Sequence, residues 1–180
     1  MLRSFAVSDS PQKDAATVST SGVSLTPLPH GVSFHRSTTH VDERGSVCEI
    51  FDARWNWHAD PVTFVYTFTL RPGMGKGWGL HKRHEDRYFL ISGEILLALY
   101  DARDDSPTKG LVSKIFLTEH DRRIVNIPAG VWHANWNIGT REAVVVNLPT
   151  RPYQHDDPDK YRLPIDTGQI PFAFERGRGR

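Results

Sequence analysis

The feature that most constrains the fold is a succession of short runs rich in β-branched and aromatic residues, with no amphipathic helical pattern between them. Examples are VTFVYTFTL at residues 62–70, EILLALYD at 94–101 and EAVVVNLPT at 142–150. Turn-forming clusters such as RPGMGKG and DARDDSPTKG separate the runs. Many short strands spaced in this way are typical of a β-sandwich or a β-barrel. The sequence therefore predicts an all-β protein.

Turn chemistry predicts how some of these strands are joined. The Gly93-Glu94 pair between RYFLIS and ILLALYD favours a tight hairpin. The DDSPTKG segment at residues 104–110 has the composition of a loop that joins two further strands.

The two ends of the chain differ in composition from its middle. Residues 1–30 are rich in Ser, Thr, Ala and Pro and are expected to form a flexible N-terminal arm, ahead of a barrel at residues 31–153. Residues 154–180 combine prolines with many charges, which argues against a central strand. We expect an extended C-terminal tail that packs on the barrel through these anchors: Tyr161, Leu163, Ile170 and Phe172.

Composition excludes several classes of partner. The net charge is +1, with 22 basic and 21 acidic residues, so neither a nucleic acid nor an anionic membrane is an expected partner. The single cysteine, Cys48, excludes an intramolecular disulfide and fits a reducing compartment. The chain has no apolar run of the ~20 residues that a bilayer span needs, and its start lacks the apolar region of a secretory signal. A cytoplasmic protein is predicted.

One strand carries an unusual polar pattern. The stretch PAGVWHANWN at residues 128–137 has the spacing PxGxxHxxxN, in which a rigid turn is followed by a strand. Side chains alternate along a strand, so His133, Asn135 and Asn137 share one face and are predicted to point into the barrel. The tryptophans between them, Trp132 and Trp136, then pack outside it or at a subunit contact.

This stretch and GWGLHKRHEDRYFLISGEI at residues 77–95 resemble the two signature motifs of the cupins, small jelly-roll barrels. His133 belongs to the second motif, whereas His81 and the carboxylate of Asp86 belong to the first. Gly79 occupies the position of the first histidine of a metal-binding cupin. The resemblance implies a cupin double-stranded β-helix, and the missing histidine predicts that the protein needs no metal. No other cofactor is expected.

A narrower resemblance covers roughly residues 33–172. The segments DERGSVCEIF, GWGLH, IPAGVWH and DPDKYRLPIDTGQIPF are similar to those of the dTDP-4-dehydrorhamnose 3,5-epimerase family. That resemblance implies a homodimeric, metal-free isomerase of carbohydrate biosynthesis that acts on a nucleotide-diphosphate sugar with a 4-keto group. A His–Asp pair removes a proton from the carbon next to the ketone, and a tyrosine returns one to the opposite face.

The resemblance also implies roles for individual residues. His81 matches the base, Asp166 is the candidate for its orienting carboxylate, and Arg44 matches an arginine that meets the diphosphate, for which a planar guanidinium is well suited. A general base of near-neutral pKa suits the removal of such a weakly acidic proton. Further residues are expected to bind the substrate: Glu49, Trp78, Arg87, His133 and Asn147.

The sequence departs from the family's pattern at three positions. Trp78 stands where the family has an arginine, and Asp86, with Arg87 beside it, stands where the family has a lysine near the enolate oxygen. Val146 or Asn147 stands where the family has its proton-donating tyrosine. The tyrosines that can substitute for it are Tyr66, Tyr88 and Tyr153.

Two alternative functions remain open. His81, Asp86 and His133 are the two histidines and one carboxylate of a metal-dependent cupin enzyme, with His84 as a replacement for Asp86. The other alternative is a non-catalytic cupin that binds a sugar nucleotide, which the absent tyrosine favours.

Overall fold

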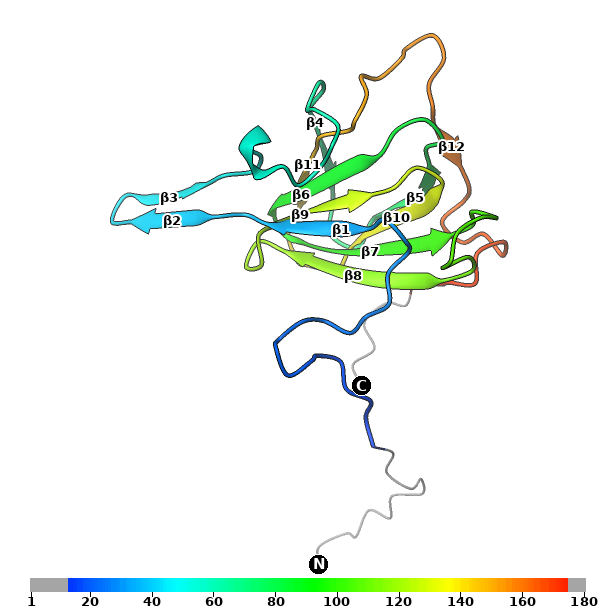
Figure 1. Cartoon of the computed structure of the whole chain (residues 1–180), viewed down its shortest axis with the longest axis horizontal. Helices are drawn as coiled ribbons and strands as arrows, with labels where there is room; N and C mark the ends of the chain where they lie inside the picture. The colour runs from blue at the N-terminus through cyan, green and yellow to red at the C-terminus, as the bar shows by residue number, and fades with distance from the viewer. Residues whose placement is uncertain (1–12, 175–180) are drawn as a thin grey trace, which may run out of the picture.

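The computed structural model describes residues 13–174, in which two five-stranded antiparallel sheets face each other (Figure 1). The strand order is β1-β9-β6-β11-β4 in the first sheet and β12-β5-β10-β7-β8 in the second, and β2 and β3 form a separate hairpin. The strands are β1 (Ser33–Arg36), β2 (Thr39–Asp42), β3 (Gly45–Cys48), β4 (Tyr66–Leu70), β5 (Gly75–Leu80), β6 (Asp86–Ser92), β7 (Glu94–Asp101), β8 (Val112–Thr118), β9 (Arg123–Ile127), β10 (Val131–Asn137), β11 (Ala143–Asn147) and β12 (Tyr161–Arg162).

Helical structure within residues 13–174 is confined to one short 3₁₀ turn, η1 (Ala53–Trp55). The predicted all-β cupin barrel is confirmed. None of the described residues forms a helix that is long and apolar enough to cross a membrane.

The chain changes sheets at Gly93, where the sequence predicted a tight hairpin. β6 pairs with β9 and β11 in the first sheet, whereas β7 pairs with β8 and β10 in the second, so the hairpin prediction was wrong. Gly93 has a φ of +88°, and a Cβ there would lie 2.8 Å from Cα of Ala143. A glycine is required because the backbones approach closely at this corner. The predicted loop at residues 104–110 does join a paired β7 and β8.

The space between the sheets holds the main hydrophobic core. Alternate residues of β7 (Ile95, Leu97 and Leu99) point inward and are fully buried against side chains of the first sheet such as Val125 and Val145. These three side chains share one face because side chains alternate along a strand. Because the apolar core fills only part of the interior, space remains for a polar pocket near β4, β5 and β12.

The C-terminal segment packs on the outer face of the second sheet. β12 extends that sheet by pairing with β5, and the residues that follow it cover Trp78 and Ala134. Ile170 is buried in this cluster, and Leu163 and Phe172 pack against it, whereas Tyr161 is exposed. The first residues of the expected N-terminal arm, 1–12, and the basic end of the tail, 175–180, lie outside the described residues.

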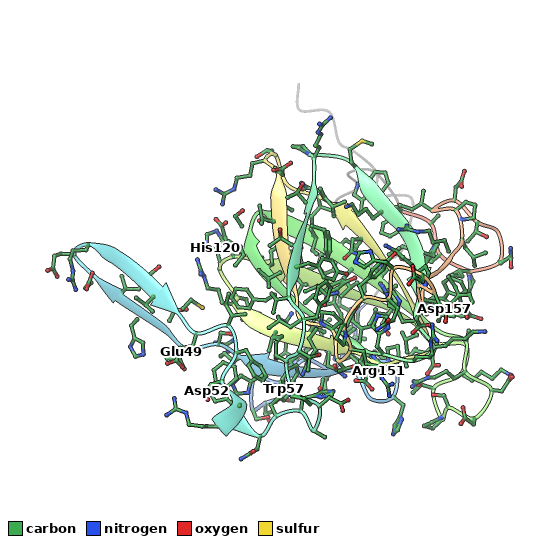
Figure 2. All side chains as sticks on the ribbon, turned by 90° about the horizontal axis from the view of Figure 1, so that it is seen from above. Glu49, Asp52, Trp57, His120, Arg151 and Asp157 are labelled. Atoms are coloured by element: carbon green, nitrogen blue, oxygen red, sulfur yellow. The ribbon has the colours of Figure 1, made fainter. Side chains whose placement is uncertain are left out.

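The β2–β3 hairpin projects away from the barrel (Figures 1 and 2). Among residues 13–174 its strands pair only with each other, and the exposed fractions of Val41 and Val47 are 78% and 69%. Glu49, which Figure 2 labels, lies at the base of this arm, and Arg44 lies in its turn.

Candidate active site

A polar cavity of about 120 Å³ opens between the two sheets, at the end of the barrel next to β12. One wall comes from β5 and β10 of the second sheet, and the other comes from β4 and β6 of the first. The tail closes the cavity with residues on and next to β12. The lining consists of Tyr66, Phe68, Lys76, Gly77, Gly79, His81, Asp86, Tyr88, His133, Asn135, Lys160 and Arg162.

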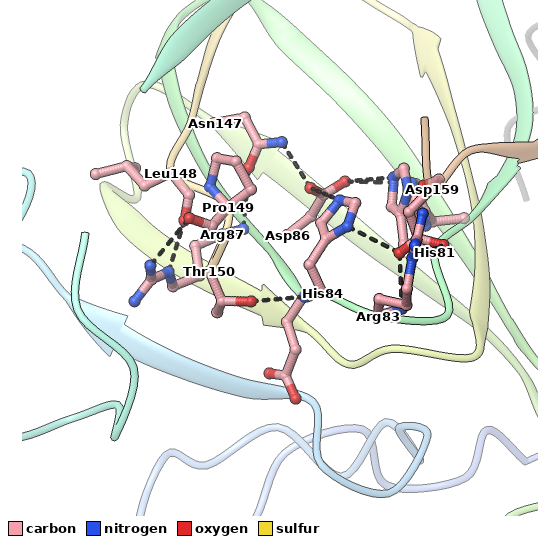
Figure 3. A network of polar contacts seen from close by, with 12 residues as sticks. His81, Arg83, His84, Asp86, Arg87, Asn147, Leu148, Pro149, Thr150 and Asp159 are labelled. Atoms are coloured by element: carbon pink, nitrogen blue, oxygen red, sulfur yellow. Dashed lines mark hydrogen bonds and ion pairs between the residues drawn. The ribbon is translucent and has the colours of Figure 1, made fainter. Parts of the chain in front are cut away.

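Asp86 is the centre of the polar network (Figure 3). Its Oδ2 lies 3.3 Å from Nε2 of His81 and 3.4 Å from Nε2 of His133, and it accepts a hydrogen bond from the Tyr88 hydroxyl. Its Oδ1 accepts one from Asn147 at 2.7 Å. Burial raises the pKa of this carboxyl, but the histidines and Asn147 outweigh burial and hold the pKa well below its usual range. Asp86 is therefore a buried anion at neutral pH.

His81 is held between two oxygen acceptors. Nδ1 donates to the main-chain carbonyl of Asp159, which leaves Nε2 as the nitrogen that faces Asp86 and the cavity. Burial lowers the pKa of His81, but the hydrogen bond and the charge of Asp86, followed by the contact with Asp159, raise the pKa above its ordinary value. The site thus favours His81 as an imidazolium and makes Nε2 a stronger base when it is neutral.

His133 has the opposite electrostatic character. Its Nδ1 lies 3.2 Å from the carbonyl of Val131, to which it donates. Burial lowers the pKa of His133 to about 4, in spite of the nearby charge of Asp86. A neutral imidazole carries one proton, so the Nε2 that faces Asp86 carries a lone pair. His133 is therefore suited to accept a hydrogen bond from a substrate hydroxyl.

Asp159 ties the C-terminal tail to the loop after β5. Its carboxylate accepts hydrogen bonds from the main-chain N–H groups of Lys82 and Arg83, at 3.0 and 2.6 Å, and lies 3.0 Å from Nδ1 of His84. Its main-chain carbonyl holds His81, as Figure 3 shows. The tautomer and the orientation of His81 thus depend on a residue of the tail.

Asn147 lies behind the lining and joins two of its members. Its Oδ1 accepts from the main-chain N–H of Arg87, which fixes the orientation of the amide. Its Nδ2 then donates to Asp86 and, at 2.8 Å, to the hydroxyl of Tyr66, the residue that it pairs with across β11 and β4.

Cations of the tail and of β5 complete the cavity. Lys76, Lys160 and Arg162 all line it, in contrast to the single buried anion at its centre. Burial lowers the pKa of Lys160, and the charge of Arg162 adds to this effect. These three basic side chains favour the binding of an anionic ligand or the formation of an anionic intermediate.

The residues that the sequence singled out divide into two groups. The structure brings His81, Asp86 and His133 together in the cavity and places Asn147 against Asp86. The metal alternative drew on the same cluster, since ligand atoms of His81, Asp86 and His133 lie within 4.8 Å of one another.

Trp78 and Arg87 point away from the cavity. Each lies on a strand between two residues that line it, Gly77 and Gly79 on β5 and Asp86 and Tyr88 on β6, so the alternation of the strand turns both outward. Trp78 is packed under the tail. The guanidinium of Arg87 is buried and donates to main-chain carbonyls of Asp60, Pro61, Leu148 and Pro149.

Arg44, Glu49 and Asp166 are also not among the residues of this cavity. Arg44 pairs with Asp42 at the tip of the β2–β3 hairpin, and Glu49 lies at the base of that hairpin. Asp166 lines a different groove, formed by Trp136 and the segment 165–174 on the outer face of the second sheet.

Sequence reasoning missed the contributions of the tail to the cavity. Asp159, Lys160 and Arg162 all lie within the DPDKYR segment, which the motif comparison treated only as a sign of family. A signal was present in their charges, because three ionisable side chains within four positions are unusual in a segment expected to pack on a barrel.

Known proteins are similar to this chain in both sequence and fold. The model of the dTDP-4-dehydrorhamnose 3,5-epimerase family matches residues 26–172. A probable low-salt glycan biosynthesis epimerase of Haloferax volcanii, Agl13, is 32% identical over 78% of this chain and 90% of its own. A dTDP sugar isomerase of Desulfovibrio desulfuricans has a TM-score of 0.75 at 25% identity, over 82% of this chain and 94% of its own.

The 3'-monoepimerase ChmJ of Streptomyces bikiniensis, in complex with dTDP-quinovose, has a TM-score of 0.71 at 21% identity, over 83% of this chain and 78% of its own. The matched region of the family model includes every strand and the cavity, and the fold agrees with that of the solved structures. The chain thus belongs to the dTDP-4-dehydrorhamnose 3,5-epimerase family of sugar-nucleotide epimerases and isomerases.

Proposed function

We propose that this protein epimerises or isomerises a nucleotide-diphosphate 4-keto-deoxyhexose, with His81 as the base that removes the proton next to the ketone. The observation that carries the proposal is the position of His81 Nε2, which faces the cavity and lies 3.3 Å from the buried carboxylate of Asp86. A cytoplasmic location is part of the proposal, and it fits the single cysteine of the chain.

The geometry suits proton abstraction for a specific reason. When neutral Nε2 takes a proton from carbon, the imidazolium that forms is adjacent to the negative charge of Asp86 and keeps its Nδ1 bond to Asp159. Both partners stabilise the product of the transfer more than the starting imidazole. Asp86 therefore takes the role of the carboxylate partner, which the sequence had led us to expect of Asp166.

The enolate that remains needs a positive charge near its oxygen. We assign this role to Lys160, which lines the cavity and whose pKa is lowered by burial. A lysine from the tail then replaces the lysine that the family carries at the position of Asp86. His133 orients the sugar by accepting a hydrogen bond from one of its hydroxyls.

The nucleotide and the diphosphate must bind outside the cavity. Its volume of about 120 Å³ is well below the roughly 300–1,000 Å³ of pockets for whole ligands. We propose a homodimer in which the β2–β3 hairpin of a second copy supplies Arg44 and Glu49 to this outer part of the site. The projecting hairpin with its exposed valines supports this arrangement.

Solvent-deuterium exchange tests the proposed function. Wild-type protein is incubated in D₂O with a panel of dTDP-linked 4-keto-6-deoxyhexoses, and NMR follows the protons next to the ketone. His81→Ala should lower exchange by about 10²–10⁴-fold, as expected for the loss of a general base, with dTDP-sugar binding changed only a few-fold. His120→Ala, at an exposed loop, is the matched control. Binding by wild-type protein without any exchange would instead identify the non-catalytic binding module.

A second candidate function, metal-assisted catalysis, is favoured by one observation. Nε2 of His133 carries a lone pair at 3.4 Å from the Asp86 carboxylate, and a cation between them would relieve that contact. Ligand atoms on bonds of about 2.1 Å at tetrahedral angles lie about 3.4 Å apart, close to the two distances from Asp86 Oδ2 to the histidine nitrogens, 3.3 and 3.4 Å.

The residues present therefore fit a divalent metal, which would polarise the ketone oxygen. Elemental analysis of purified protein, with the melting temperature measured before and after chelation, separates the two candidates. Near-stoichiometric metal that Asp86→Asn abolishes supports the metal function. Metal-free protein with full exchange activity supports the acid–base function alone.

A further inference from the structure

Inversion at carbon requires a proton donor on the side of the substrate opposite to the base. His133 on β10 and His81, directly after β5, lie on the wall of the second sheet, whereas Tyr66 on β4 belongs to the facing wall of the first sheet. A sugar ring between the two sheets therefore presents one face to His81 and the other to the wall that carries Tyr66. This relationship between the walls follows from the sheet topology and does not depend on a particular substrate.

The hydrogen bonds show which hydroxyl has a proton to give. Asn147 uses its Oδ1 to accept from the main chain, so its Nδ2 is the donor to Tyr66, and the Tyr66 oxygen is the acceptor in that bond. The hydroxyl proton of Tyr66 is used in no hydrogen bond to another described residue. Tyr88 differs, because it donates its proton to Asp86 and is almost completely buried.

Tyr66 is also accessible and protonated. Its exposed fraction is 38%, and it lines the cavity, whereas Tyr153 lies outside the cavity and packs against His155. Burial, together with the charge of Asp86, raises the pKa of Tyr66 to about 12, so the hydroxyl keeps its proton at neutral pH. Donation from Asn147 stabilises the phenolate that proton transfer leaves behind.

We propose that Tyr66 is the catalytic acid that returns a proton to the carbon on the face opposite to His81, with Asn147 as its positioning residue. The inference rests on the proposed function. His81 Nε2 takes the proton, and the electrons of the C–H bond form the enolate. The Tyr66 hydroxyl then protonates the same carbon from the other side, and the enolate returns to the ketone. The imidazolium and the phenolate that result are neutralised through solvent, so no oxidant or reductant is needed.

The experiment compares exchange with inversion in the same D₂O reaction on the panel of dTDP-linked 4-keto-6-deoxyhexoses. Tyr66→Phe should lose inversion by about 10²-fold or more, while His81 continues to exchange the proton with retention of configuration within a few-fold of wild type. Tyr153→Phe, the matched control, should match wild type in both measurements. Inversion by Tyr66→Phe within a few-fold of wild type overturns the inference and leaves the proposed function intact. A wild-type protein without exchange overturns both.

A second measurement covers the case in which Tyr66→Phe folds poorly. Site-specific replacement of Tyr66 by 3-fluorotyrosine keeps the shape of the side chain and lowers the pKa of its phenol. The alkaline limb of the pH profile for inversion should then move to lower pH, with the profile for exchange unchanged. An inversion profile that does not move contradicts the role of Tyr66.

Discussion

The main-chain carbonyl of Asp159 accepts a hydrogen bond from Nδ1 of His81, although the two residues lie 78 positions apart in the chain. β12, which begins at Tyr161, pairs with β5, and this pairing brings Asp159 to the loop that follows β5. The tail therefore completes the site from outside the motifs that carry the histidines.

Asp159→Asn should lower turnover by about tenfold. The amide nitrogen of asparagine accepts no hydrogen bond, so one of the main-chain N–H groups of Lys82 and Arg83 loses its acceptor, and one hydrogen bond contributes about 1 kcal/mol. The melting temperature should fall by only about 2–4 °C. Asp157→Asn is the matched control, since that side chain is 80% exposed and pairs with Arg83 on the surface. Equal activities of the two variants would show that the carboxylate of Asp159 does not position His81.

Gly79→Ala should impair activity more than stability. Gly79 lies opposite His133 on the neighbouring strand, and a Cβ there would be 3.2 Å from its Nε2, so the imidazole must shift by a few tenths of an ångström. A fall in kcat of about tenfold is expected, because displacements of this order are costly in active sites. Gly168→Ala, where a Cβ has no neighbour within 4 Å, is the control. Wild-type kinetics for Gly79→Ala would show that catalysis does not depend on the exact position of the His133 imidazole.

The shifted pKa of Asp101 leads to a prediction of how the stability of the protein depends on pH. Burial raises the pKa of this carboxyl, but hydrogen bonds from Arg103, Ser106 and Thr108 outweigh burial and hold the pKa well below its ordinary value of 3.8. The unfolded state then binds more protons at low pH, so this stabilisation is complete above that ordinary value and is lost as the pH falls below it.

Asp101→Asn should therefore lower the free energy of unfolding at neutral pH by about 1–3 kcal/mol and flatten its decline below about pH 4. Urea denaturation at several pH values measures both effects. Asp104→Asn, at a side chain that is 94% exposed, should change neither. If the free energy of unfolding of Asp101→Asn declines below about pH 4 as steeply as that of the wild type, other carboxylates determine the stability at low pH.

Val41→Glu combined with Val47→Glu should convert the proposed dimer into a monomer. The two valines are among the most exposed apolar side chains of the described residues, and burial of charge at an interface opposes association. Light scattering coupled to size exclusion gives the mass of each species. Met74→Glu, at an exposed position between β4 and β5, should remain dimeric. A double variant with the mass of the wild-type dimer would place the subunit contact elsewhere.

The polar face of β10 shows what could be predicted from local sequence. Alternation along a strand placed His133, Asn135 and Asn137 on one face and Trp132 and Trp136 on the other. The structure has His133 and Asn135 in the cavity and the two tryptophans under the tail. Asn137 is buried outside the cavity lining and donates to the main-chain carbonyls of Leu70 and Arg141. The same rule applied to β5 and β6 turns Trp78 and Arg87 outward. Their assignment to substrate binding came from counting positions in a motif, without asking which face each side chain occupies.

The carboxylate partner of His81 could not be predicted in this way. The tail offers Asp156, Asp157, Asp159 and Asp166, and nothing in their local spacing says which of them reaches the loop after β5. Which aspartate reaches that loop depends on the register of β12 against β5, in which Tyr161 lies opposite Leu80. The sequence analysis considered Asp86 only as a metal ligand or as a substitution for the family's lysine, yet it is the carboxylate that faces both His81 and His133.

The sequence by itself determined the all-β class, the loop at residues 104–110 and the polar inward face of β10, because strand propensity, turn chemistry and alternation depend on residues close together in the chain. Only the tertiary structure decided that the chain changes sheets at Gly93, that Asp159 holds His81 and Lys160 lines the cavity, and that Asn147 donates to Tyr66. Each of these contacts joins segments far apart in the chain. Their register is set by the packing of whole sheets and by the path of the tail, which local patterns do not encode.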